Sequence, residues 1–256
     1  MRALAAVAFA VGGVYVGTFV NLLIDRVPEK KRVSPLRAGC RNCPDASDGG
    51  RRRPLVPWLL RRRCPTCGEA VPGRYPLVEV ITALLFAGTV LRFGADAAVP
   101  AYLVFFTSLL AVSVIDLQLQ IIPNRIVYPT IMVCLPLLAL AALVDGDLEP
   151  LGRALLGAAG AWTLLFLVHL VSPAGMGFGD VRLAFVLGLF LGWLSLSHVV
   201  FGVFLGFALG AVIGLGLVVF SGRSRKDTVP FGPFLAAGAA ITVFVGRPVI
   251  DWWLGG

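Results

Sequence analysis

The sequence predicts an all-α polytopic membrane protein with about eight transmembrane helices and a small cytoplasmic zinc-binding loop domain after the first helix. Of its 256 residues, 58% are hydrophobic and 14% are charged, and the mean hydropathy is +0.89. Soluble domains carry about 25% charged residues, so this chain lacks the polar surface of a water-soluble globule. Intrinsic disorder is excluded as well, because disordered segments are polar and charged.

Eight segments are long and apolar enough to cross a bilayer, which needs about 20 residues per helix. Helices are expected rather than strands, because lipid offers no partner to backbone polar groups and barrel strands would alternate in polarity. The longest run without Asp, Glu, Lys or Arg is divided into two helices at Ser195-Leu196-Ser197-His198. In chain order, the segments are 3–24, 75–93, 97–115, 126–144, 154–179, the two parts of 183–222, and 228–246.

The Lys and Arg residues set the orientation, because cytoplasmic loops are enriched in positive charge. With eight spans and the N-terminus outside, 18 of the 22 basic residues fall on one side of the membrane and 4 on the other. We interpret the net charge of +8 as this topology signal, so no nucleic-acid partner is expected. A cleaved signal peptide is the alternative for the first span, but its apolar run continues to Val20 and basic residues follow.

The composition divides the chain into a first transmembrane helix at 1–24, a cytoplasmic loop domain at 25–76 and a seven-helix membrane domain at 77–256. The loop domain holds two Cys-x2-Cys pairs separated by twenty residues. Two such pairs are typical of a structural, tetrahedral zinc site. Two disulfides are the alternative, which the reducing cytoplasm disfavours. The expected zinc ligands are Cys40, Cys43, Cys64 and Cys67.

Two aspartates lie where predicted helices meet the cytoplasmic face. Asp116 ends the third span, and Asp180 precedes the sixth, directly after Gly177-Phe178-Gly179. Ionisable groups at the edges of spans are costly and point to function. Two neighbouring carboxyl groups titrate as a coupled pair in which one keeps its proton, and such a pair can act as general base and general acid. The glycines are expected to allow backbone conformations that other residues cannot adopt.

Position alone leaves other roles open for these residues. An aspartate at a helix end can cap the helix, and Asp180 would suit an N-cap. A proton-coupled transporter would use Asp116 and Asp180 as a proton relay. A zinc-dependent scaffold is a third reading, in which the membrane helices serve as an anchor. His169 and His198 are isolated in their spans, and we expect them to be packing or interface residues.

Six motifs, in order along nearly the whole chain, resemble those of the bacterial prepilin peptidase family, whose members are GxGD intramembrane aspartyl peptidases. The GxGD motif itself is Gly177-Phe178-Gly179-Asp180, and Asp116 with Pro123 and Asn124 is similar to the first aspartate motif of that family. The other four are 17–21 together with 26–28, the two cysteine pairs, 74–79, and 229–234.

The resemblance implies an enzyme of the bacterial inner membrane that removes the basic leader from type IV prepilins or pseudopilins on the cytoplasmic side. Asp116 and Asp180 would be the catalytic pair, supported by Gly177, Gly179, Pro123 and Asn124. Longer family members also methylate the new N-terminal amine with S-adenosylmethionine, and the cysteine loop marks the longer form. No methyl-donor site is identified by spacing or chemistry, and the oligomeric state is left open.

The chain departs from the common pattern of the resembled family at three positions. Asn124 stands where many members have Asp, Arg182 where many have Lys, and Asp25 where many have an aromatic residue. The first two changes keep a polar side chain. The stretch 54–58, between the cysteine pairs, lacks the Asn-Ile-Pro of many members, which bears on the methyltransferase rather than on the peptidase.

Overall fold

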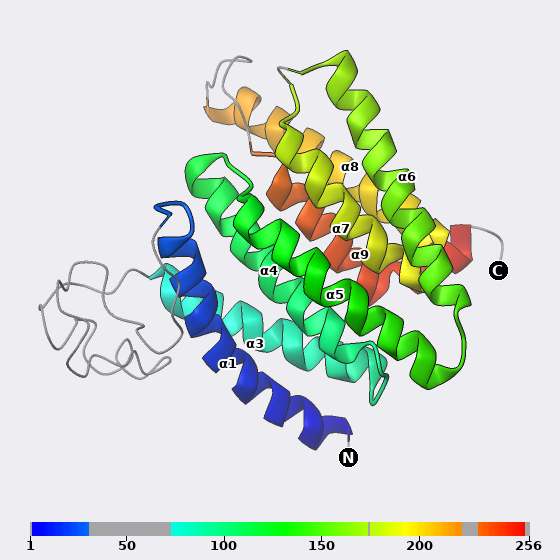
Figure 1. The fold of residues 1–256 in the computed structure, drawn as a ribbon. Helices are drawn as coiled ribbons and strands as arrows, with labels where there is room; N and C mark the ends of the chain where they lie inside the picture. Colours follow the sequence, from blue (N-terminus) through cyan, green and yellow to red (C-terminus); the bar gives the residue numbers. More distant parts are fainter. Residues whose placement is uncertain (1, 31–72, 174, 222–229, 254–256) are drawn as a thin grey trace, which may run out of the picture. The chain divides into compact units, whose positions relative to one another are not determined.

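The computed structural model describes residues 2–30, 73–173, 175–221 and 230–253, and all regular secondary structure within these ranges is helical (Figure 1). The helices are α1 (Arg2–Arg26), α3 (Arg74–Phe93), α4 (Val99–Leu119), α5 (Asn124–Asp145), α6 (Glu149–Val171), α7 (Phe178–Leu194), α8 (Leu196–Ser221) and α9 (Gly232–Trp253). The four cysteines of the expected zinc site lie outside the described residues, so that site stays a prediction.

The expectation of an all-helical chain is confirmed for the described residues, but the number of membrane-spanning helices among them is seven and not eight. Seven of the eight described helices are long and apolar enough to cross a membrane. The exception is α7, which has 17 residues. Twelve residues of α7 are buried, including Asp180. This helix therefore lies among protein side chains along most of its length.

The predicted helix boundaries are right at one place and wrong at another. The break inside 183–222 falls at Ser195, between α7 and α8. The segment 154–179, in contrast, does not form a single helix. Instead, α6 begins earlier, at Glu149, and ends at Val171. Pro173 follows two residues later, and a helix usually ends before the residue that precedes a proline.

The chain separates into two compact units, which are considered in turn. The first comprises Met1–Ala95 and Phe106–Ala111, and the second comprises Asp96–Phe105 and Val112–Gly256. In the first unit, α1 and α3 pack backbone to backbone at two glycines of α1. A Cβ atom at Gly13 would lie 2.7 Å from the Cα atom of Ala83, and one at Gly17 would lie 2.6 Å from that of Glu79. Glycine at these positions lets the helices approach closely.

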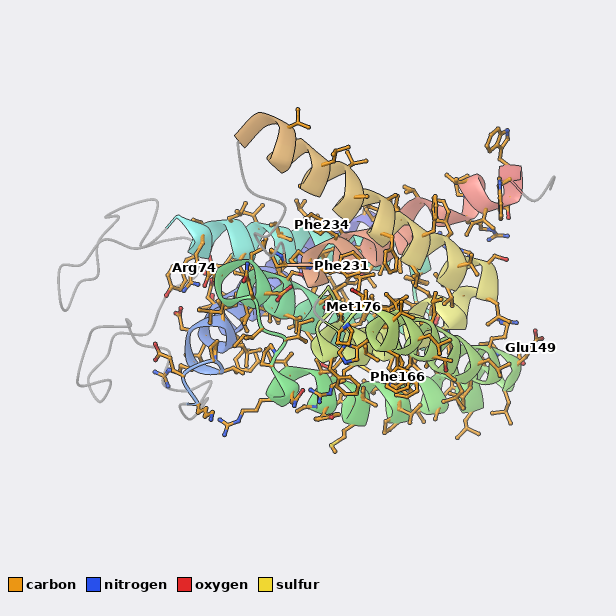
Figure 2. All side chains as sticks on the ribbon, turned by 90° about the horizontal axis from the view of Figure 1, so that it is seen from above. Arg74, Glu149, Phe166, Met176, Phe231 and Phe234 are labelled. Atoms are coloured by element: carbon orange, nitrogen blue, oxygen red, sulfur yellow. The ribbon has the colours of Figure 1, made fainter. Side chains whose placement is uncertain are left out.

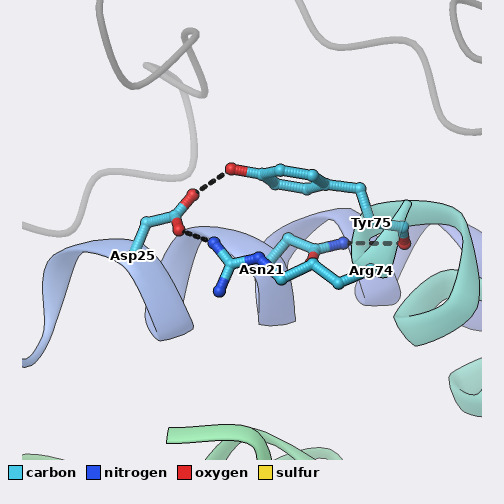
Figure 3. Close-up of polar contacts among 4 residues, drawn as sticks. All are labelled: Asn21, Asp25, Arg74 and Tyr75. Carbon is cyan, nitrogen blue, oxygen red and sulfur yellow. Dashed lines mark hydrogen bonds and ion pairs between the residues drawn. The ribbon is translucent and has the colours of Figure 1, made fainter. Parts of the chain in front are cut away.

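Polar side chains join the same two helices where α1 ends and α3 begins. The Asp25 carboxylate accepts hydrogen bonds from the Arg74 guanidinium and the Tyr75 hydroxyl (Figure 3). The side-chain amide of Asn21 donates to the Tyr75 carbonyl oxygen at 3.0 Å. One turn further into the helices, the Thr18 hydroxyl donates to Glu79 at 3.1 Å. The first-helix motif and the 74–79 motif are therefore in direct contact.

In the second unit, glycines bring α6 against α7 and α8 against α9 (Figure 1). A Cβ atom at Gly188 would lie 2.2 Å from the carbonyl oxygen of Gly157, and one at Gly238 would lie 2.5 Å from the amide nitrogen of Gly206. These are contacts within one chain. At Gly214, by comparison, a Cβ atom would meet no atom of the described chain within 4 Å.

An aromatic cluster and one buried hydrogen bond place the start of α4 against α7. The Phe105 and Phe190 rings stack with centroids 4.2 Å apart. The Tyr102 hydroxyl donates to the Phe190 carbonyl oxygen at 2.9 Å. The buried thiol of Cys134 in α5 lies 3.7 Å from the Ala101 carbonyl oxygen of α4. These contacts bring α4, α5 and α7 together.

Replacing Gly188 with alanine should destabilise the protein, because the new methyl group would overlap the backbone of α6. Overpacking of this kind costs about 1–3 kcal/mol or more. Gly160→Ala on α6 is the matched control, since nothing lies within 4 Å of its Cβ position. The control should be neutral or up to about 1 kcal/mol more stable. Thermal unfolding in detergent measures both, and equal stabilities for the two variants would contradict the packing described.

Candidate active site

Asp116 lies three residues before the end of α4 and is 4% exposed. The helix ends because Gln120 adopts a left-handed conformation (φ 55°) and donates its amide to the Asp116 carbonyl oxygen at 2.8 Å. The Asp116 carboxyl group points to another element. Its Oδ2 atom accepts a hydrogen bond from the backbone amide of Gly232, the first residue of α9, at 3.1 Å. Phe231 and Phe234 mark this start of α9 in Figure 2.

Asp180 is the third residue of α7 and is 7% exposed. The suggestion that Asp180 is the N-cap is wrong, because Gly177 holds that position and its carbonyl oxygen accepts the Asp180 amide at 3.1 Å. The Asp116 and Asp180 carboxyl groups are close enough to interact electrostatically. Asp180 Oδ1 is buried and has no hydrogen-bond partner among the described residues. One carboxyl oxygen of the pair is thus left for a water or a substrate.

Ile122, in the turn between α4 and α5, lies next to Gly179, which precedes Asp180, and next to Gly232, which binds Asp116. A Cβ atom at Gly179 would lie 2.9 Å from Ile122 Cβ, and one at Gly232 would lie 3.2 Å from Ile122 Cδ1. A Cβ atom at Gly232 would also lie 2.7 Å from Asp116 Oδ2. Three segments far apart in sequence therefore converge here: the α4–α5 turn, the start of α7 and the start of α9.

The glycines of the GxGD motif do not serve the purpose expected from sequence. Gly177 has φ −69° and ψ 146°, which any residue can adopt. Among the described glycines, positive φ angles occur at Gly94 and Gly146, outside the motif. Gly179 is needed for a different reason, since a side chain there would collide with Ile122. The expectation of a special backbone conformation is wrong, and close approach explains Gly179 instead.

Pro123 and Asn124 form the start of α5, beside the site. Pro123 is the N-cap of that helix. The side-chain oxygen of Asn124 accepts a hydrogen bond from the Arg182 guanidinium at 2.5 Å. The same guanidinium lies over the Phe178 ring, 4.6 Å from its centroid, and 6.0 Å from that of Tyr128. Asn124 and Arg182, two of the departures from the common family pattern, are therefore direct partners.

Sequence reasoning missed the part that Gly232 takes in the site. The segment 229–234 was identified as a motif, but no local pattern indicates that its glycine amide binds an aspartate 116 positions earlier. No group of His, Cys, Asp or Glu side chains suited to hold a metal ion is found in the part of the chain that the structure describes. The reactive groups of this region are the two buried carboxyl groups, those of Asp116 and Asp180. Such a pair suits general acid–base hydrolysis.

Comparison with known proteins gives a consistent result over both parts of the chain. Residues 103–215 match the type IV leader peptidase family, and residues 11–93 match the bacterial peptidase A24 N-terminal domain. No solved structure gives a significant match.

Several curated relatives carry the name prepilin leader peptidase/N-methyltransferase. The one from Burkholderia pseudomallei (strain K96243) is 31% identical, over 94% of this chain and 86% of the relative. That from Bacillus subtilis (strain 168) is 29% identical, over 94% of this chain and 95% of the relative. The Pseudomonas putida protein is 32% identical, over 93% of this chain and 89% of the relative.

The contact between Asn124 and Arg182 predicts energetic coupling between the two side chains. In a double-mutant cycle with Asn124→Ala and Arg182→Ala, we expect a coupling energy of about 1 kcal/mol. Asn124→Asp combined with Arg182→Lys should restore the contact as an ion pair. Thermal stability in detergent measures these terms. A cycle between Arg182 and the exposed Arg125 is the control, and coupling of equal size in both cycles would argue against a specific contact.

Proposed function

The chain belongs to the type IV leader peptidase family, and from this premise we propose that it is an intramembrane aspartyl endopeptidase in which Asp116 and Asp180 are the catalytic pair. Its substrates are type IV prepilins or pseudopilins, from which it removes the basic leader peptide. The observation that carries the catalytic assignment is the convergence of the two buried aspartates, one of which keeps an oxygen without a partner in the described structure.

The mechanism follows from two carboxyl groups in different protonation states. The ionised aspartate takes a proton from a water molecule, whose oxygen attacks the carbonyl carbon of the scissile peptide bond. The protonated aspartate donates to the carbonyl oxygen. When the tetrahedral intermediate collapses, the carbon–nitrogen bond breaks and the leaving amine takes the proton that the first aspartate gained from water. A hydroxyl group of the intermediate returns its proton to the second aspartate, which restores the starting protonation states. Both aspartates exchange protons in this cycle, so both side chains are essential.

The proposed setting is the bacterial inner membrane, with the N-terminus outside and both aspartates near the cytoplasmic face. The seven long apolar helices support a multi-pass protein. The excess of Lys and Arg on one side supports the orientation. In this setting the apolar segment of a prepilin enters from the bilayer, while its basic leader stays in the cytoplasm.

A second activity, N-methylation of the new N-terminal residue with S-adenosylmethionine, is part of the proposal. It is supported by the names of the relatives, which include N-methyltransferase. Zinc held by Cys40, Cys43, Cys64 and Cys67 would have a structural role, since four thiolates leave no open coordination position. These cysteines lie outside the described residues.

Asp116→Asn and Asp180→Asn should each abolish leader cleavage, because neither variant has both an acid and a base. The test is co-expression with a prepilin from the same genome and mass spectrometry of the substrate N-terminus. A methyl group on the cleaved parent product would demonstrate the second activity. Clear residual cleavage in either variant would refute the catalytic pair. An uncut substrate with well-expressed parent enzyme would favour the alternative, a proton-coupled transporter that uses the same pair.

The two glycines of the motif should respond differently to alanine. Gly179→Ala places a methyl group against Ile122 and shifts the start of α7, and a displacement of about 1 Å can cost on the order of 100-fold in rate. Gly177→Ala meets its nearest atom, Asp180 Oδ2, at an ordinary 3.5 Å, and should retain most of the parental rate. The cleavage rate of purified protein measures the difference. Equal losses would show that Gly177 has a role that its geometry does not explain.

A further inference from the structure

The segment between α6 and α7 is tied to α6 by the side chain of His169. The His169 Nδ1 atom lies 2.7 Å from the carbonyl oxygen of Met176. A carbonyl oxygen can only accept, so the ring must donate its Nδ1–H group. Met176 is buried, and the next residue is Gly177, the N-cap of α7. Met176 is labelled in Figure 2.

This hydrogen bond acts on the peptide unit that leads to Asp180. The Met176 carbonyl and the Gly177 amide belong to one planar, trans peptide group, so they point in opposite directions. A Cβ atom at Gly177 would lie 3.5 Å from Asp180 Oδ2, which places that carboxyl group beside the same residue. Holding the carbonyl therefore fixes the orientation of the peptide group next to which the Asp180 carboxyl group lies.

The ring of His169 also packs on the side chain inside the GxGD motif. Its centroid is 5.6 Å from that of Phe178, with an interplanar angle of 61°. Phe166, also labelled in Figure 2, meets Phe178 edge-on at 6.4 Å. Trp162 stacks on Phe166 at 4.9 Å. Residues 162, 166 and 169 share one face of α6 because they are three or four positions apart, and this face receives Phe178.

The backbone hydrogen bonds that the structure describes between α6 and α7 do not involve the Met176 carbonyl oxygen, which is bound by His169 instead. The carbonyl oxygen of Ser172 accepts the amides of Gly175 at 3.0 Å and Met176 at 3.3 Å. These bonds close a turn, but they do not orient the peptide group that follows it. In the described structure, the His169 imidazole is the hydrogen-bond partner of the Met176 carbonyl oxygen.

We propose that His169 is a positioning residue for Asp180: its Nδ1–H group latches the Met176 carbonyl and thereby sets the start of α7 and the GxGD aspartate. This inference rests on the proposed peptidase function. Both the Nδ1–H tautomer of the neutral ring and the imidazolium can donate from Nδ1.

Two variants of His169 distinguish the effect of its hydrogen-bond donor from the effect of the size of its ring. His169→Leu removes the donor at similar volume, whereas His169→Asn retains an N–H donor close to the Nδ1 position. Leu170→Ala, at the next and lipid-accessible position of α6, is the control. The full-length protein in detergent is assayed for kcat and KM on a prepilin. Amide hydrogen exchange of residues 172–180, measured by mass spectrometry, reports on the hydrogen bond between His169 and Met176 without any substrate.

His169→Leu should lower kcat on the order of 10- to 100-fold at nearly unchanged KM, and should speed amide exchange in 172–180. His169→Asn should restore both properties, and Leu170→Ala should change neither. Parental kcat in the leucine variant, an asparagine variant as slow as the leucine variant, or unchanged exchange would each overturn the latch. A parent enzyme that leaves prepilins uncut would instead count against the proposed function, while the exchange data still decide on the latch.

Discussion

The second unit depends on one constraint: two carboxyl groups must be buried among apolar helices. A buried carboxylate without partners is costly. Asp116 is compensated by the amide of Gly232, and Asp180 by its place in the first turn of α7, where the helix dipole is positive. Both arrangements require backbone segments to approach closely, so glycine stands at 179 and 232. The site is thus built from helix ends and small residues.

The sequence allowed the helical class and the positions of the eight helices in the described residues to be predicted, although only seven of these are long enough to span a membrane. Charge-free runs in a chain of this hydropathy have few alternatives. Helix ends were less certain. The end of α6 at Val171 is set by Pro173. A search for charge-free segments does not detect this end, because the apolar sequence continues past the proline. The topology predicted from the sequence puts Asp116 and Asp180 on one side of the membrane, but it did not predict the contact with the Gly232 amide. That contact joins residues 116 positions apart, and only the packing of α9 creates it.

The first unit shows how two distant motifs can form one structure. Asp25 and Arg74 flank a long stretch of chain, yet their side chains bind each other where α1 ends and α3 begins. Below them, Gly13 and Gly17 let the helix backbones touch. A loop whose ends are held by packed helices costs little more when it is lengthened, because closure entropy grows only slowly with length. Residues added between α1 and α3 would therefore leave the contact of Asp25 with Arg74 in place.

The burial of α7 has a consequence for how the protein responds to its membrane. Helices that face lipid must match the hydrocarbon thickness, and they tilt or deform the bilayer when they do not. Most residues of the short helix α7 contact protein rather than lipid. Changes in acyl-chain length or growth temperature would therefore act on the surrounding helices first. Asp180, carried by α7, would be insulated from such hydrophobic mismatch, so the geometry of the two aspartates can persist in bilayers of different composition.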